Sequence, residues 1–178
     1  MRKKLINPKF LKAAVYGAND GIITTFAVVA GVAGAKLAAS VVLILGIANM
    51  VADGLSMAVG DYLGEHSEQR LRKQQQQAFE EDGLWKTGVV TFVAFVVAGT
   101  LPLLPYIVHS LGLSFPQEYQ FIYSILATGG ALFVVGSMRT FLTKGSWLIN
   151  GLEMLSIGAI AALVAYFLGA AIESLINS

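Results

Sequence analysis

Four side chains that could bind a cation follow one another at four-residue steps: Asn49, Asp53, Met57 and Asp61. Residues four apart lie on one face of an α-helix, so these groups predict a single polar ridge. Methionine by itself is a common filler of apolar packing. Beside an amide and a carboxylate, its thioether adds a soft ligand to oxygen ligands, which favours a borderline transition ion such as Fe²⁺ over Mg²⁺ or Ca²⁺. The set does not distinguish iron from manganese or cobalt.

The composition places this ridge inside a membrane. Of the 178 residues, 56% are hydrophobic and only 13% are charged, and the mean hydropathy is +0.69, which lies outside the usual balance of a soluble domain. The formal net charge of +1 gives no reason to expect nucleic-acid binding. Cysteine is absent, which excludes disulfides and thiolate metal sites. We therefore predict an integral membrane protein whose partner is the lipid bilayer, with no nucleic acid.

Five apolar segments are long enough to cross a bilayer, which takes about 20 helical residues. They lie near 13–37, 40–64, 86–108, 120–142 and 147–173. Lipid does not tolerate unpaired backbone groups, and the alternation of a β-barrel is missing, so all five are expected to be helices. The predicted fold is all-α, a single five-helix transmembrane domain over 1–178 with a short connection at 65–85. A cleaved export signal is the alternative for the first segment, but such a signal has little reason to carry Asp20.

The basic residues predict an orientation. All lysines and arginines except Lys36 lie in the N-terminal tail or in the connections that follow the second and fourth helices. Basic residues near membrane-spanning segments concentrate on the cytosolic side. We therefore expect a multi-pass protein whose N-terminus is cytosolic and whose C-terminus lies on the opposite side.

Two carboxylates fall within the first two apolar segments. Asp20 lies about 10 Å from the cytosolic end of its helix and Asp53 about 16 Å from the cytosolic end of the next, at 1.5 Å per residue. A charge at the bilayer centre costs at least ~2.5–3.5 kcal/mol, so such a residue usually faces a cavity, an ion or a partner. No basic residue lies at that depth in either helix, and a divalent cation or bound protons would neutralise the pair. Alternatively, each is protonated and bonded to serine, threonine or backbone.

The cytosolic end of the second helix carries further acidic residues. Glu65 and Glu68 share a face beyond Asp61, and they predict either a solvated surface or a weak capture site where cations enter from the cytosol. Nearby His66 is a candidate ligand with no further support, and Glu80, Glu81 and Asp82 follow in the connection.

Other residues carry expectations about packing. Gly17 and Gly21 form a GxxxG step around Asp20, which lets neighbouring helix backbones approach closely. Glu153 is expected to pair with Arg139 or Lys144 at the cytosolic surface. Two prolines, Pro102 and Pro105, predict that the third helix ends near them.

Two stretches resemble a known family. "YGANDGIITTFAVVAGVAGA" and "LGIANMVADGLSMAVGDYLGEHSE" are similar to the first two helices of the vacuolar iron transporter family, particularly its shorter nodulin-like branch. The resemblance implies a five-helix protomer that works as a homodimer, with a pore between the copies lined by the first two helices. It also implies transport of Fe²⁺ and related divalent ions out of the cytosol in exchange for protons. Asp20 and Met57 match the family's path residues.

The chain departs from the family pattern at two places. Well-characterised members have a glutamate eight residues before the methionine, where this chain has Asn49. Asp53, typical of the "VADG" branch, lies between Asn49 and Met57 and could compensate for the lost charge. The second departure is the connection at 65–85, which is too short for the glutamate-rich cytosolic domain that many members insert there.

These observations favour a divalent-metal and proton antiporter that moves Fe²⁺ or Mn²⁺. In this hypothesis Asp20 and Asp53 bind the ion, Met57 and Asn49 complete its shell, and protonation drives release. The alternatives are a non-transporting membrane scaffold or regulatory subunit and an intramembrane aspartyl protease, whose GxGD signature is broken here by Ala58. No HExxH, GxSxG or phosphate-binding loop appears, so we expect neither an enzyme nor a bound cofactor.

Overall fold

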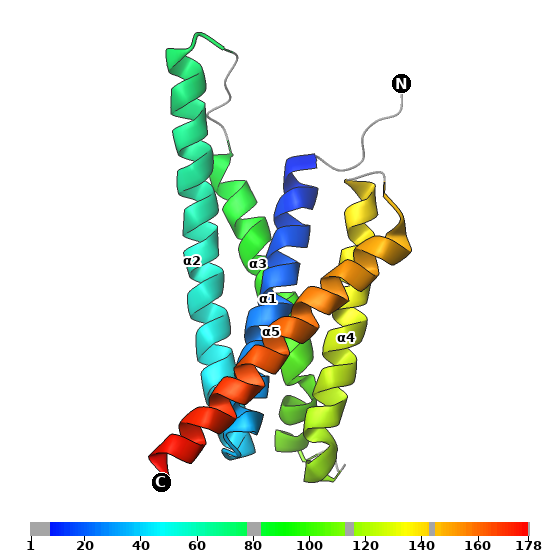
Figure 1. Ribbon diagram of the computed structural model, residues 1–178. Coiled ribbons are helices and arrows are strands. Elements are labelled where there is room, and N and C mark those ends of the chain that lie inside the picture. The colour runs from blue at the N-terminus through cyan, green and yellow to red at the C-terminus, as the bar shows by residue number, and fades with distance from the viewer. Residues whose placement is uncertain (1–7, 78–82, 113–115, 143–144, 178) are drawn as a thin grey trace.

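The chain forms five long helices and two short 3₁₀ turns (Figure 1). The computed structural model describes residues 8–77, 83–112, 116–142 and 145–177, and no strand occurs among them. The elements are α1 (Pro8–Gly34), α2 (Ala39–Gln74), α3 (Leu84–Ser110), η1 (Gln117–Tyr119), α4 (Gln120–Met138), η2 (Arg139–Phe141) and α5 (Trp147–Ile176). Five helices are long and apolar enough to cross a membrane, as predicted.

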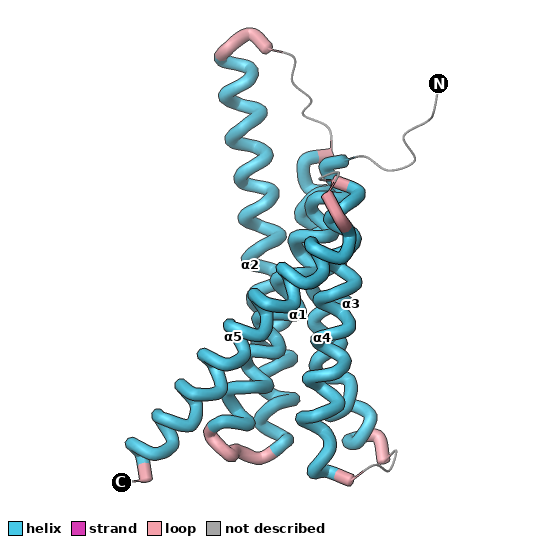
Figure 2. Tube along the Cα trace, turned by 45° about the vertical axis from the view of Figure 1, so that its right-hand side comes forward, coloured by secondary structure: helices cyan, strands magenta, loops and turns pink. Residues whose placement is uncertain are grey.

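The helix α2 is longer than its apolar segment. It continues to Gln74, through the first half of the predicted 65–85 connection. The added sequence consists largely of Glu, Gln, Arg and Lys, which favour helix without help from packing. Figure 2 shows that this part of α2 projects beyond the ends of the other helices. The remainder of the connection includes residues 78–82, among them Glu80, Glu81 and Asp82, which lie outside the described residues.

The prediction that α3 ends near its two prolines is wrong. Pro102 and Pro105 are both buried inside the helix, which continues to Ser110. Neighbouring helices allow proline inside a membrane-spanning helix. At Pro102 the contact with α4 is a hydrogen bond, in which the Ser124 hydroxyl donates to the Pro102 carbonyl oxygen over 2.6 Å.

The helix α3 packs on α1 and on α2, and small residues bring these two neighbours close. A methyl group at Gly17 would lie 2.5 Å from the carbonyl oxygen of Thr91, and one at Gly21 would collide with the carbonyl oxygen of Phe95. The GxxxG step of α1 therefore packs on α3 rather than on α2. On the other side, a methyl group at Gly88 would lie 2.5 Å from the carbonyl oxygen of Ala58 in α2.

The helix α5 crosses the bundle obliquely (Figure 1). Near its start it packs on α4, where a methyl group at Gly136 would lie 2.6 Å from the carbonyl oxygen of Asn150. Near its end it packs on α1, where Gly34 touches the backbone of Tyr166 and Gly169 touches the backbone of Gly31. Because α5 changes partner along its length, α1 and α5 are in backbone contact only toward the C-terminal end of each helix.

Two helices leave large faces exposed, and these faces differ in kind. The exposed face of α5 carries bulky side chains such as Ile160, Leu163 and Phe167. The exposed part of α2 includes a row of small residues at four-residue steps: Ala48, Ala52, Ser56, Gly60 and Gly64. Bulky apolar side chains suit a lipid surface, whereas small ones allow a second helix to approach closely.

The close contact between α1 and α3 gives a test of the packing. We expect Gly21→Ala to lower the free energy of unfolding by about 1–3 kcal/mol, because the added methyl group forces the two backbones apart. Gly130→Ala is the control, since a methyl group there meets no atom within 4 Å among the described residues. Thermal unfolding in detergent would measure both, and equal midpoints for Gly21→Ala and wild type would contradict the packing.

Candidate cation-binding path

Asp20 and Asp53 lie on neighbouring helices, α1 and α2, and both are partly buried. Their carboxylates are close enough to interact electrostatically. The Asn49 side chain donates a hydrogen bond of 2.7 Å from Nδ2 to Oδ2 of Asp53, one helical turn away. Asn49 therefore fixes the Asp53 carboxylate on the face that the ridge predicted.

Asp20 has no such support. The Thr24 hydroxyl donates to the backbone carbonyl of Asp20 over 2.9 Å, and among the described residues none donates a hydrogen bond to its carboxylate. A carboxylate at this depth without a donor is costly unless a cation or a proton joins it.

The ridge continues along α2 toward the N-terminal end of α1. Met57 is partly buried between Asp53 and Asp61. The Thr91 hydroxyl of α3, which is fully buried, donates to Oδ2 of Asp61. This hydrogen bond holds the Asp61 carboxylate against α3. Asp61 lies about 12 Å along α2 from Asp53, at 1.5 Å per residue.

A pocket of about 480 Å³ lies at the end of this ridge. Three carboxylates that the sequence assigned to the cytosolic entrance, Asp61, Glu65 and Glu68, line it together with Lys9, Lys12 and Tyr16 of α1. Two of the carboxylates are paired: Lys9 Nζ lies 3.0 Å from Glu65 Oε2, and Arg72 lies 2.5 Å from Glu68 Oε1. The pocket is therefore acidic but holds its own lysines, with which an arriving cation must compete.

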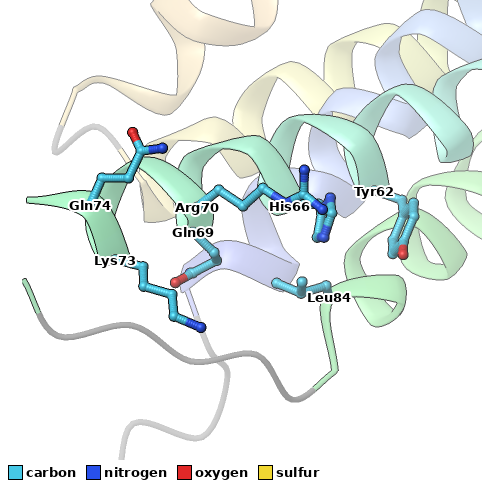
Figure 3. A pocket seen from close by; sticks show the side chains of 7 residues that line it. All are labelled: Tyr62, His66, Gln69, Arg70, Lys73, Gln74 and Leu84. Atoms are coloured by element: carbon cyan, nitrogen blue, oxygen red, sulfur yellow. The ribbon is translucent and has the colours of Figure 1, made fainter.

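His66 does not belong to this pocket. Its ring stacks on Tyr62 with the ring centres 6.0 Å apart, and it lines a separate pocket of about 750 Å³ beside Arg70 and Lys73 (Figure 3). Glu65 and His66 are consecutive, so they point in directions about 100° apart on the helix. Two cations beside the imidazole make this pocket a poor site for a metal ion.

The expected ion pair at the start of α5 is confirmed. Arg139 Nη1 lies 3.2 Å from Glu153 Oε2, while Lys144, the other expected partner, lies outside the described residues. Glu153 therefore belongs to the surface near α4 and α5, away from the ridge on α2.

A single protomer spreads its path residues along two helices. Within the described parts of the chain, no three His, Asp or Glu side chains gather closely enough to hold a metal ion. Asp20 and Asp53 form a pair, and Met57 and Asn49 lie on either side of Asp53 along α2. Asp61 lies farther along α2, at the acidic pocket. The described protomer therefore offers carboxylates that are spread along the ridge rather than gathered into one site.

Sequence reasoning missed two residues that shape the path. Thr91 reaches Asp61 from a helix 30 positions away, and Lys9 reaches Glu65 across 56 positions. The spacing of residues within one helix cannot predict either contact. The four-residue step from Thr87 to Thr91, which places two hydroxyls on one face of an apolar helix, was the available signal.

Known proteins resemble the chain over most of its length. The model of the VIT family matches residues 11–82 and 76–170. The vacuolar iron transporter of Toxoplasma gondii is 25% identical in a match 230 positions long, which covers 95% of this chain and 76% of that protein. Vacuolar iron transporter homolog 2 of Arabidopsis thaliana is 28% identical over 167 residues, which cover 89% of this chain and 82% of that protein.

The hydrogen bond between Thr91 and Asp61 can be measured by a double-mutant cycle. We expect Thr91→Val and Asp61→Asn to couple by about 1.5–3 kcal/mol in the free energy of unfolding, because the bond involves a charged acceptor. Thr87→Val is the matched control, since the Thr87 hydroxyl bonds the Leu84 carbonyl within its own helix over 2.9 Å. Equal coupling energies for Thr91 and Thr87 would contradict the assigned contact.

Proposed function

Because this chain belongs to the VIT family, we propose that it transports divalent transition-metal ions, Fe²⁺ above all, across a membrane between α1 and α2. The observation that carries the proposal is the pair of carboxylates Asp20 and Asp53, which interact inside two membrane-spanning helices. The names of the relatives, vacuolar iron transporters in apicomplexans and plants, support iron as the transported ion.

The proposed path runs from the acidic pocket at Glu65 and Asp61 to the pair Asp20 and Asp53. Along it the ion meets carboxylates, one amide and one thioether, so hard and soft ligands alternate. Met57 favours Fe²⁺ over Mg²⁺ and Ca²⁺, and Mn²⁺ shares enough of this ligand chemistry to be a second substrate.

Protons are the proposed counter-substrate. A pair of carboxylates in a low dielectric is most stable when its charge is balanced, either by a divalent ion or by protons. Exchange of one for the other at Asp20 and Asp53 gives a metal and proton antiporter. The distribution of basic residues favours a cytosolic N-terminus, with the acidic pocket on the same side, so the proposed direction for the metal is out of the cytosol.

The proposed assembly is a homodimer that joins along α2. The row of small residues from Ala48 to Gly64 is exposed on the protomer and would let a second copy approach closely. This row lies one residue before the ridge Asn49, Asp53, Met57 and Asp61, so the ridges of two copies would border one space. Such a dimer would supply the additional carboxylates that the single protomer does not gather in its described residues.

The path is tested by ion flux into proteoliposomes that contain a pH dye. We expect Asp20→Asn and Asp53→Asn each to lower the initial Fe²⁺ flux by about tenfold or more, because the ion loses one of its two charged ligands. Glu118→Gln, an exposed acidic residue at the other end of the bundle, is the control and should leave the flux unchanged.

Two outcomes would contradict different parts of the proposal. Unchanged metal flux in both aspartate variants would reject the path and would favour the scaffold hypothesis. Metal flux without a matching change of internal pH would reject the antiport while leaving the path intact.

The dimer is tested by disulfide cross-linking, for which the absence of native cysteine leaves a clean background. We expect Ser56→Cys, in the small-residue row of α2, to form a covalent dimer in membranes on mild oxidation. Ser156→Cys is exposed on α5 and should not. Cross-linking through α5 alone would place the interface elsewhere.

A further inference from the structure

The helices α1 and α5 diverge toward the N-terminal end of α1. The two helices touch through backbone near Gly34 and Tyr166, but the start of α5 packs on α4 instead, as Gly136 and Asn150 show. The space between the helices forms a pocket of about 320 Å³, which falls in the range of ligand-binding pockets. This pocket adjoins the acidic pocket of the path, and Lys12 and Tyr16 line both.

The lining of this pocket divides into a charged part and an apolar part. Lys12, Arg139 and Glu153 supply the charges, two positive and one negative. Val15, Leu142, Met154 and Ile157 supply the apolar surface. Arg139 is held by its ion pair with Glu153, which positions its guanidinium at the pocket.

The surroundings place the pocket at the level of lipid headgroups. Tyr16, which also lines it, is 63% exposed, and Trp147 at the start of α5 is 57% exposed. Exposed Tyr and Trp near the ends of membrane-spanning helices are typical of the interface between headgroups and hydrocarbon. Ile157, three turns into α5, is 49% exposed, so an apolar surface leads from the charged end of the pocket toward the hydrocarbon core.

We propose that this pocket between α1, η2 and α5 binds the phosphate group of an anionic phospholipid from the leaflet at the N-terminal end of α1. Lys12 and Arg139 bind the phosphate, and one acyl chain lies over Val15 and Ile157. Basic pockets between helices at this level commonly bind anionic headgroups. A metal ion does not suit the pocket, because its net charge is positive.

The binding is tested by native mass spectrometry and by thermal unfolding of delipidated protein in a neutral detergent. The ligands are phosphatidylglycerol, phosphatidylcholine with the same acyl chains, and soluble glycerol 3-phosphate. We expect the apparent Kd for phosphatidylglycerol to be about tenfold lower than for phosphatidylcholine, because both lipids carry the phosphate but only the second carries a choline cation, which Lys12 and Arg139 repel. Glycerol 3-phosphate should neither bind measurably nor raise the unfolding temperature, because it lacks the acyl chains.

Four variants locate the site. Arg139→Gln and Lys12→Gln should each weaken phosphatidylglycerol binding by about tenfold. Arg70→Gln removes the same charge from a different pocket and should have no effect. Glu153→Gln breaks the same ion pair as Arg139→Gln but keeps the guanidinium, so it should bind the lipid at least as tightly as wild type.

The outcomes separate this proposal from its competitors. Equal binding of the two lipids, or full binding by Arg139→Gln, would overturn it. Binding of glycerol 3-phosphate as tight as that of the lipid would assign the pocket to a free phosphate compound instead. A loss in Glu153→Gln equal to that in Arg139→Gln would show that the ion pair maintains the fold and that the guanidinium does not bind the lipid.

Discussion

The cost of keeping two carboxylates inside a membrane-spanning bundle constrains everything else in this structure. Asp20 and Asp53 interact across α1 and α2, and among the described residues only Asp53 receives a hydrogen bond from a side chain, that of Asn49. An apolar environment makes an unsatisfied charge expensive, so the free energy of the bundle depends on what neutralises the two carboxylates. The described side chains around Asp20 leave that part of the cost uncompensated.

The five helices could be predicted because membrane crossing imposes length and apolarity on each one separately. The packing partners of each helix could not be predicted, because a small residue allows close approach but does not determine which helix approaches it. The step from Gly17 to Gly21 illustrates this: its spacing predicted a close helix contact beside Asp20 without identifying the partner helix, which is α3. The same limit applies to Pro102 and Pro105, which the structure buries inside α3 among neighbouring helices that their local sequence does not identify.

The candidate site was predictable to the extent that it follows one helix. The four-residue steps from Asn49 to Asp61 placed four side chains on one face, and the hydrogen bond from Asn49 to Asp53 follows directly from that spacing. Contacts between helices lay beyond this reasoning. Thr91 and Lys9 approach Asp61 and Glu65 from elements far away in the chain, and they decide how strongly the acidic end of the ridge is already neutralised.

The oblique course of α5 has a mechanical consequence for α1. At Gly31 and Gly34, α1 is locked against α5 by backbone contact and has no room to slide. Toward Lys12 the two helices diverge, and no comparable clamp joins them among the described residues. Because Gly17 and Gly21 hold α1 against α3 by equally close backbone contacts, any tilt of α1 about its lower end in Figure 1 would carry α3 with it.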